Sequence, residues 1–145
     1  MKIYTCLVGD LFHAGHVNYL RQCKSLGDYL LVGVCSDEDT THYKRKPILN
    51  LQERAEVISA CKYVDEIILC PPSIITNEFL DTHSVDLVVH GNDSNEDQLR
   101  HFYQLAMDRG IYQSVPYTPG ISTTQIIQRI RSRADDEVTR RNFLC

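Results

Sequence analysis

The chain has 145 residues, of which 43% are hydrophobic and 23% charged, a size and composition that suit one folded domain rather than two. Disordered, collagen-like and fibrous classes are therefore excluded. Lys and Arg number 15 and Asp and Glu number 19, so the net charge of −4 provides no overall positive field for nucleic acid or an anionic membrane. An anionic ligand must instead meet a local cluster of donors.

The first apolar run and the cysteines bear on the compartment. The run over residues 3–8 ends at Gly9 and Asp10, far short of the roughly 20 residues of a membrane span, and it has no signal-peptide cleavage site. The 6 cysteines show no CxxC spacing, and most lie in apolar segments, where cysteine packs as a small hydrophobic residue. We therefore expect reduced thiols, no membrane span and a cytoplasmic protein.

Apolar runs of strand length alternate with segments of helical period along the chain. This alternation predicts an α/β fold, a Rossmann-like parallel sheet of about five strands with helices on both faces. The strands are expected at residues 2–8, 29–35, 65–70, 85–90 and 111–115. The helices are expected at residues 14–26, 51–61, 76–83, 95–109 and from Ser122 onward.

Cap residues indicate where three of these helices begin or end. Gly27 stops the first helix, since glycine is the common residue just past a helix end. Asn50 is followed three residues later by Glu53, and Ser122 by Gln125, which is the spacing of a capping box. These pairs fix the starts of the second and last helices.

One segment is expected to be a loop, and another is expected to lose helical order. The charged segment 37–49 is predicted to be a loop at the carboxyl edge of the sheet, where open α/β sheets bind ligands. From Arg131 the chain is rich in charge and poor in apolar periodicity. We therefore expect one domain over residues 1–130 and, over residues 131–145, a frayed helix and a mobile charged tail, either a solvated end or a functional arm.

The first segment with evident chemistry is DLFHAGH, between the first predicted strand and helix. His13 and His16 straddle the helix start, where unpaired NH groups and about half a positive charge stabilise phosphate oxygens. Gly15 leaves room for the backbone to approach a ligand, and imidazoles add directional donors suited to phosphoryl or nucleotidyl transfer. On spacing alone, a surface pair or a two-ligand metal fragment with Asp10 explains the pattern equally well.

Four ordered segments make the chain resemble a known family. DLFHAGH, YKRKPILNLQER, KYVDEII and GISTTQII fall in the order and rough spacing of the HxGH nucleotidyltransferase superfamily, and within it of the cytidylyltransferases that make CDP-alcohols. The resemblance covers residues 3 to about 130. The segments LRQCKSLGDYLLVGVCSDED and VDLVVHGND look most like the ethanolamine-phosphate branch, then the glycerol-3-phosphate branch. The former usually has two such domains in tandem, whereas we expect one here.

The resemblance implies roles for the residues around the first helix start. His13 and His16 would steady the α-phosphate and the bridging oxygen as pyrophosphate leaves, and Lys44 would bridge the two phosphate-bearing substrates. The alternative is that Lys44 has no function and is a solvated charge in a basic loop beside Arg45 and Lys46. The neighbouring residues implied to bind the nucleotide are Val8, Gly9, Asp10 and Gly15.

Two further segments and one arginine are implied as nucleotide contacts. At the last helix start, hydroxyls and free NH groups would hold the β- and γ-phosphates, although Ser122 alone fits an ordinary cap. After the fourth strand, amide or carboxylate groups would meet the cytosine and ribose, and a tight turn explains this triplet about as well. Arg54 would lie near the nucleotide, with an exposed helix charge as the alternative. The two segments comprise Gly120, Ile121, Ser122, Thr123 and Thr124, and Gly91, Asn92 and Asp93.

Two other segments are implied to meet the acceptor and a second subunit. Asp37, with Glu38 and Asp39, follows the second strand, where a carboxylate would bind the ammonium of the acceptor. The alternative is an ordinary charged loop. Residues 62–66 correspond to a family segment that often lies at a homodimer interface, and otherwise are a helix end and a strand start.

The chain departs from the family pattern at two points. Members usually read GxFD or GxYD before the first histidine, whereas residues 7–10 read LVGD, which shifts backbone donors to the triphosphate. The last segment normally reads RTxGISTT, whereas Tyr117 stands where the arginine is expected. A phosphate-binding cation is thus absent unless Lys46, Arg129 or another group substitutes, and its loss would weaken nucleotide binding roughly ten- to a hundredfold.

The sequence therefore predicts an enzyme of phospholipid biosynthesis. It would transfer CMP from CTP, with Mg²⁺ on the triphosphate, to phosphoethanolamine, phosphocholine or glycerol 3-phosphate, as a homodimer. The acceptor phosphate is itself a competent nucleophile, which fits a chain without an evident nucleophile and adjacent base. An adenylyltransferase of coenzyme biosynthesis and a nucleotide-binding protein with weak or no activity are the alternatives. The main hypothesis requires His13 and His16 to face Ser122 and Thr123 across one hollow.

Overall fold

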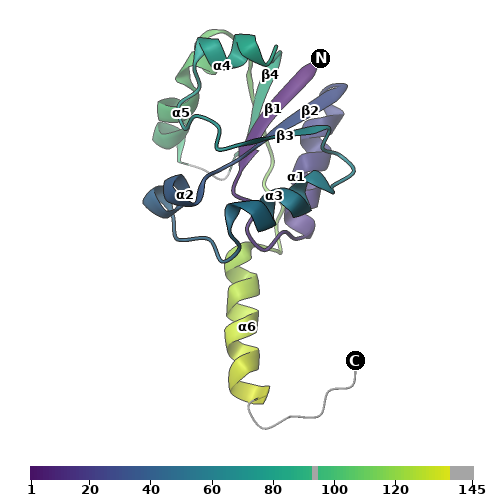
Figure 1. The fold of residues 1–145 in the computed structure, drawn as a ribbon, viewed down its shortest axis with the longest axis vertical. Helices are drawn as coiled ribbons and strands as arrows, with labels where there is room; N and C mark the ends of the chain where they lie inside the picture. The colour runs from purple at the N-terminus through teal and green to yellow at the C-terminus, as the bar shows by residue number, and fades with distance from the viewer. Residues whose placement is uncertain (93–94, 138–145) are drawn as a thin grey trace.

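The computed structural model describes residues 1–92 and 95–137, which form a five-stranded sheet flanked by helices (Figure 1). The strand order is β3-β2-β1-β4-β5, and every neighbouring pair is parallel. The predicted Rossmann-like α/β fold is thereby confirmed. The strands are β1 (Lys2–Leu7), β2 (Tyr29–Val34), β3 (Glu66–Leu69), β4 (Leu87–Gly91) and β5 (Tyr112–Val115). The helices are α1 (Ala14–Ser25), α2 (Asp37–Tyr43), α3 (Leu51–Ser59), α4 (Asn77–Thr82), α5 (Glu96–Asp108) and α6 (Thr123–Glu137).

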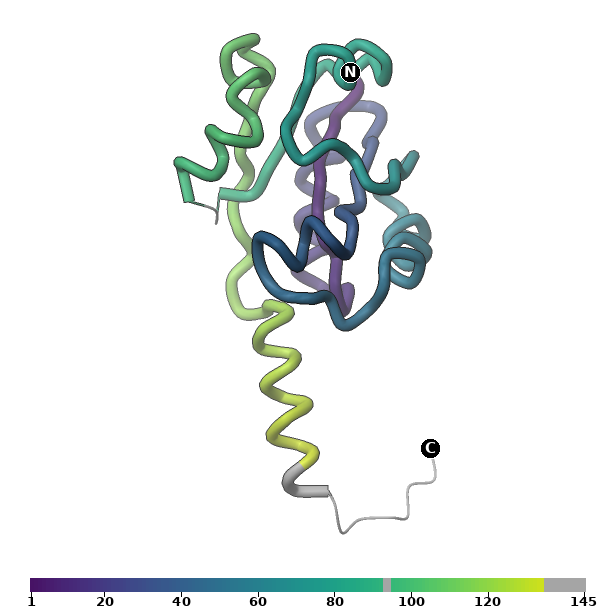
Figure 2. Tube along the Cα trace, turned by 60° about the vertical axis from the view of Figure 1, so that its left-hand side comes forward, coloured from purple at the N-terminus to yellow at the C-terminus, as the bar shows by residue number. Residues whose placement is uncertain are grey.

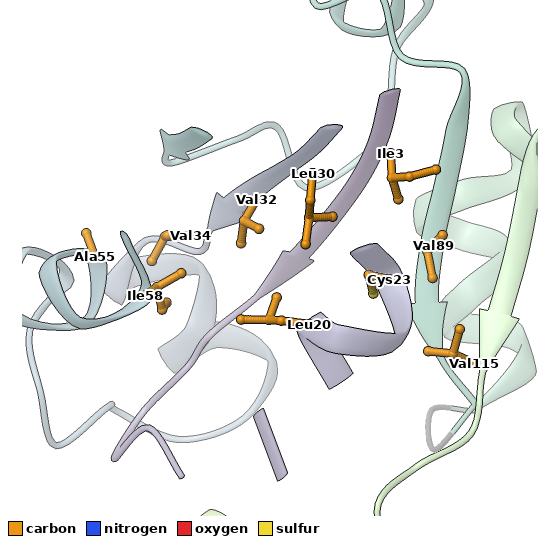
Figure 3. Close-up of a cluster of buried hydrophobic side chains, with 10 residues drawn as sticks. All are labelled: Ile3, Leu20, Cys23, Leu30, Val32, Val34, Ala55, Ile58, Val89 and Val115. Atoms are coloured by element: carbon orange, nitrogen blue, oxygen red, sulfur yellow. The ribbon is translucent and has the colours of Figure 1, made fainter. Parts of the chain in front are cut away.

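Two apolar layers cover the two faces of the sheet. Successive side chains of a strand point to opposite faces, so the continuous run of β2 fills both layers. Leu30 and Val32 pack in the layer that contains α1 and α3, whereas Leu31 between them packs in the layer of α4 and α5. Figure 3 shows the first layer, which comprises Ile3, Leu20, Cys23, Leu30, Val32, Val34, Ala55, Ile58, Val89 and Val115.

The carboxyl ends of the parallel strands gather the loops at one edge of the sheet, and α6 begins at this edge. Both views show α6 running away from the body of the molecule (Figures 1 and 2). The side chains of residues 128–134 on this helix are exposed. In the described ranges of the chain, no helix has the length and apolar character needed to cross a membrane.

The structure corrects one expectation of local structure. Segment 37–49 is not a loop throughout, because it begins with α2, whose N-cap Ser36 accepts the NH of Asp39 at 3.0 Å. The helical sequence DEDTTHY has no apolar period to reveal it, but its acidic first turn favours a helix start. Helix α6 continues to Glu137, past Arg131, in the region where a frayed helix was expected. The rest of the predicted tail lies outside the described residues, and the division at residue 130 stays a prediction.

Candidate functional site

A cleft of about 590 Å³ opens at the carboxyl edge of the sheet, between the β1–α1 loop, the segment after α2 and the start of α6. His13, His16, Ser122 and Thr123 all line it, which confirms the expected shared hollow. The predicted site residues that line the cleft are Val8, Gly9, Asp10, His13, Gly15, His16, Lys44, Gly91, Ile121, Ser122, Thr123 and Thr124.

Other predicted site residues lie beside the cleft rather than in its wall. Gly120 has a φ of +88°, a left-handed conformation that glycine adopts without strain, and it shapes the turn into α6. The Asn92 side chain accepts the NH of Tyr117 at 2.9 Å and so ties the end of β4 to the segment after β5. Asp93 lies outside the described residues. Arg54 and Asp37 are treated below.

The two histidines cap α1 with their own rings. Nδ1 of His13 accepts the NH of Gly15 at 3.0 Å, and Nδ1 of His16 accepts the NH of His13 at 3.1 Å, a capping box made of imidazoles. A nitrogen that accepts a hydrogen bond carries no proton, so a neutral ring bonded in this way carries its proton on Nε2. The cap therefore selects the tautomers that present two Nε2–H donors. The ring centroids are 3.8 Å apart.

Burial keeps these imidazoles uncharged at neutral pH. It lowers the pKa of His16 to about 4, and the nearby His13 adds to this effect. Burial also lowers the pKa of His13. Both rings thus act at pH 7 as neutral donors, so positive charge in the cleft must come from other side chains. Fixed donors of this kind stabilise charge that develops on phosphate oxygens during transfer.

Gly15 is required by the ring packed against it. A Cβ at this position would lie 2.8 Å from Cε1 of His13 and 3.2 Å from Cγ2 of Ile121. Both neighbours line the cleft, so a side chain here would push either the histidine or the α6 segment out of place. The glycine of HxGH therefore serves close packing of the two helix starts.

Thr123 joins the start of α6 to the start of α1. Its hydroxyl donates to the carbonyl of Asp10 at 3.1 Å, and its Oγ1 lies 3.4 Å from Nε2 of His13. Ser122 caps the helix by accepting the NH of Gln125 at 3.1 Å. The first amides of a helix have no intrahelical acceptor, so the amides of Thr123 and Thr124 provide donors at the cleft wall.

Asp10 holds the segment that carries Lys44. Its two carboxylate oxygens accept the NH groups of Ile48 and Leu49, each at 2.9 Å, and the residue is only 6% exposed. At the other end of the segment, the NH of Lys44 donates to the carbonyl of Thr40 at 2.9 Å. The carboxylate of Asp10 is thus committed to positioning this loop.

Arg54 is a buried clamp, which rules out the exposed-charge alternative, whereas its predicted position near the nucleotide stays a prediction. The residue is 0% exposed and does not line the cleft. Its guanidinium donates to the carbonyls of Leu49 at 3.1 Å, Val8 at 2.7 Å and Cys35 at 2.9 Å. A fourth bond, of 2.7 Å, goes to Asp37. Asp37 therefore pairs with this arginine at the start of α2 and is not part of the described cleft lining, and its acceptor contact stays a prediction.

Arg45 is a cleft residue that sequence reasoning passed over. It lines the cleft, and its Nη2 donates to Oγ1 of Thr124 at 3.2 Å. Lys46 and Arg129, considered as substitutes for the arginine missing at Tyr117, are not part of the described lining. The only signal in the sequence is the run of three consecutive basic residues before the Asn-capped helix. Their spacing does not indicate which of the three side chains lines the cleft.

The metal fragment considered for the histidine pair receives no support. Among residues 1–92 and 95–137, no three His, Cys, Asp or Glu side chains are grouped so as to hold a metal ion. Nδ1 of each histidine already accepts a backbone NH, and both oxygens of Asp10 do the same. These groups are committed to shaping the site.

A parallel α/β sheet with helix starts and neutral donors around a cleft at its carboxyl edge defines a protein of the Rossmann-like class, in which ligands bind at this edge. The family model described as "Cytidylyltransferase-like" matches residues 9–129. The chain belongs to this family.

Curated relatives carry cytidylyltransferase names. The chain is 39% identical over 126 residues to ethanolamine-phosphate cytidylyltransferase of Dictyostelium discoideum, covering 83% of this chain and 35% of that protein. It is 38% identical over 150 residues to choline-phosphate cytidylyltransferase A of Mus musculus, covering 99% of this chain and 40% of that protein. The chain therefore spans well under half the length of these relatives.

Solved structures support the fold. The lipopolysaccharide core biosynthesis protein of Thermoplasma volcanium has a TM-score of 0.66 and 27% identity, with 83% of this chain and 98% of that chain covered. Pantothenate synthetase of Thermus thermophilus has a TM-score of 0.60 and 12% identity, with 92% of this chain and 64% of that chain covered. The second likeness concerns the fold alone.

Proposed function

We propose that this chain transfers CMP from CTP to a small phosphomonoester, releasing pyrophosphate and a CDP-alcohol. The observation that carries this proposal is the cleft in which two neutral imidazole donors, the Lys44 ammonium and the first amides of α6 converge. The names of the curated relatives favour phosphoethanolamine, then phosphocholine, as the acceptor, and phospholipid biosynthesis as the setting. Glycerol 3-phosphate is the remaining candidate.

The proposed reaction is an in-line displacement at the α-phosphorus. An oxygen of the acceptor phosphate forms a bond to this phosphorus, while the bond to the oxygen that bridges to the β-phosphate breaks and pyrophosphate departs. Two anions must approach each other, so the work of the protein is alignment and charge compensation. Lys44 offsets the repulsion, and the Nε2–H groups of His13 and His16 stabilise charge on the α-phosphate and the bridging oxygen.

Mg²⁺ enters the proposal with the nucleotide. Oxygen atoms are the ligands that this ion prefers, and it commonly binds substrate phosphates while keeping several waters. Asp10 is the carboxylate in the described cleft lining, and its oxygens already accept two backbone NH groups. The triphosphate is therefore the proposed holder of the ion, and Mg²⁺ supplies further charge neutralisation when bound.

A homodimer and a cytoplasmic location complete the proposal. Residues 62–66 follow α3 and enter the edge strand β3, and Val57 on α3 and Leu69 on β3 are each 42% exposed. Exposed apolar side chains at a sheet edge favour pairing with a second copy. The five described cysteines are free thiols, as in a reducing compartment. Light scattering at several protein concentrations tests the dimer.

A substrate matrix tests the function. CTP and ATP are each combined with phosphoethanolamine, phosphocholine, glycerol 3-phosphate or an aminoalkyl phosphonate, with Mg²⁺, and pyrophosphate release is measured. We expect release with CTP and phosphoethanolamine or phosphocholine. Release with ATP and not with CTP would favour the adenylyltransferase. Calorimetric binding of CTP without release in any combination would favour a nucleotide-binding protein that lacks transfer.

A further inference from the structure

We propose that Arg45 binds the β- and γ-phosphates of the nucleotide and retains its hold on them as pyrophosphate forms. The α2–α3 loop would thus supply a cation in place of the family arginine, whose position before α6 is occupied by Tyr117. The ligand chemistry is a diphosphate group at the start of α6. This inference rests on the proposed function for the identity of the nucleotide.

The first argument is the hydrogen-bonding state of the guanidinium. Arg45 donates one N–H to Thr124, at the first turn of α6, at 3.2 Å. In the described part of the chain, its other four N–H groups have no hydrogen-bond partner. A planar guanidinium with several free donors matches two phosphate oxygens at once, and the nearby helix start attracts the same anion.

The second argument is that the backbone on either side of Arg45 is fixed. The preceding residue, Lys44, donates its NH to the carbonyl of Thr40, the last hydrogen bond of the α2 end. Three and four residues beyond Arg45, the NH groups of Ile48 and Leu49 donate to the carboxylate of Asp10. The arginine is therefore presented from a short anchored span, and binding of an anion does not have to order the loop.

The third argument is that the two cations of the cleft serve different ends of it. Lys44 lines the cleft together with His16, and after burial and His13 its charge adds to the lowering of the pKa of His16. Arg45 instead contacts α6. Lys44 and Arg45 are the Lys and Arg side chains of the described lining, and His13 and His16 are neutral at pH 7. The acceptor phosphate then pairs with Lys44 and the departing diphosphate with Arg45.

The chain offers a matched control in the next residue. Lys46 has the same charge, is also exposed and belongs to the same loop, but it does not line the cleft. A general loss of positive charge would affect variants of either residue alike. If Arg45 itself binds the diphosphate, only substitutions of Arg45 would weaken diphosphate binding. Since both side chains are exposed, neither substitution removes a core contact, and both variants are expected to fold.

The experiment is calorimetric binding of inorganic pyrophosphate, CTP and CMP, all with Mg²⁺, to the wild type, Arg45→Gln, Arg45→Lys and Lys46→Gln. We expect Arg45→Gln to weaken pyrophosphate and CTP binding roughly ten- to a hundredfold, the scale of a charge-assisted contact. Arg45→Lys should recover part of this loss, because it keeps the charge without the planar fork. CMP lacks the two outer phosphates, so its affinity should be the same in all four proteins.

Three results would overturn the inference. They are wild-type pyrophosphate affinity in Arg45→Gln, equal weakening of CMP and CTP in that variant, and a wild-type protein that binds neither pyrophosphate nor CTP. The inference and the proposed function fail separately. A wild type that binds CTP and pyrophosphate but transfers no CMP contradicts the function, and the Arg45→Gln affinities then still decide the role of Arg45.

Discussion

His16 shows how one side chain links the helix cap to the chemistry. Its Nδ1 closes the capping box, while its Nε2 is left to meet a ligand. Gln at the same position of a capping box can also accept the N-cap NH, but it lacks the second ring nitrogen. His16→Gln therefore separates the structural function of this residue from its proposed chemical one.

We expect His16→Gln to lower the turnover of CMP transfer roughly 10²- to 10³-fold, the usual cost of removing one preorganised donor. The helix start keeps its cap, so the variant should remain folded by circular dichroism. Steady-state pyrophosphate release measures the effect, with Lys46→Gln as an exposed control that should keep wild-type turnover. Wild-type turnover in His16→Gln would rule out the assigned role.

The buried imidazole also makes stability depend on pH. The pKa of His16 is lowered from 6.5 to about 4 in the folded protein, chiefly by burial. The unfolded chain therefore binds more protons between these values, and the free energy of unfolding falls as the pH drops from about 6.5 to about 4. Above about pH 6.5 this group has no further effect on stability. The whole difference is on the order of 3 kcal/mol.

Urea unfolding at about pH 7.5 and about pH 5 measures this contribution. The wild type should lose more unfolding free energy than His16→Gln over that interval, since other groups titrate equally in both proteins. Parallel losses in the two proteins would show that the folded imidazole titrates normally.

Residue type and spacing were enough to predict some of the site residues but not the others. The helix start, the two histidines and the Ser-Thr-Thr segment were predictable because each has a local signature. Burial of Arg54 was not, because a charged residue on a helix has no local signal for the four acceptors that enclose it. The position of Arg45 in the cleft could not be predicted either, because its partner Thr124 is 79 residues away along the chain.

At the scale of elements, the Arg54 clamp fastens several of them together. One guanidinium connects the ends of β1 and β2, the start of α2 and the turn before α3. The same turn is held from the other side by Asp10. The loop that carries Lys44 and Arg45 is thus positioned by two charged residues that sequence reasoning had assigned to the nucleotide.

We expect Arg54→Ala to lower the free energy of unfolding by about 3–5 kcal/mol, because it leaves buried carbonyls and Asp37 without their partner. Arg109→Ala provides the comparison, since Arg109 is exposed and lies 3.6 Å from Asp81. Its loss should cost at most about 1 kcal/mol. Urea titrations of the two variants measure the difference, and similar small losses would contradict the clamp.

Element boundaries were predictable where the chain has an apolar period and a cap. The strands and α1, α3 and α5 lie within a few residues of their predicted ranges for this reason. Helix α2 was missed because its seven residues have one buried side chain, Thr40, and its stability comes from the Ser36 cap and the nearby clamp. Short polar helices of this kind depend on tertiary contacts that no local pattern records.

For the whole molecule, the fold separates a packed body from a projecting helix. The described side chains of residues 131–134 are exposed, and the cleft lining reaches α6 only through its first residues. The division at residue 130 proposed from the sequence is therefore directly testable by shortening the chain.

Removal of residues 131–145 should leave pyrophosphate release unchanged and shift the thermal midpoint by no more than about 4 °C. The reason is that the described part of this segment buries no side chain and takes no part in the cleft. Activity and calorimetric unfolding of the shortened chain provide the measurement. A large loss of activity would instead make the segment a functional arm, the alternative considered from the sequence.

The alternation of strands and helices predicted a parallel sheet, but not its order. The order β3-β2-β1-β4-β5 places the ends of β1 and β4 side by side at the centre of the edge. This adjacency brings Gly91 beside the β1–α1 loop, and it depends on pairing between segments some eighty residues apart, such as Ile3 with Leu87. Local propensity contains no record of such pairings.

The contact between Thr123 and Asp10 spans 113 residues and joins the two halves of the cleft. During synthesis the first half leaves the ribosome early, while its counterpart is among the last parts of the folded body to emerge. The cleft is therefore incomplete on a nascent chain, and a nucleotide that binds there would stabilise only the completely synthesised domain. Protection from proteolysis by CTP would then report how many chains have completed folding.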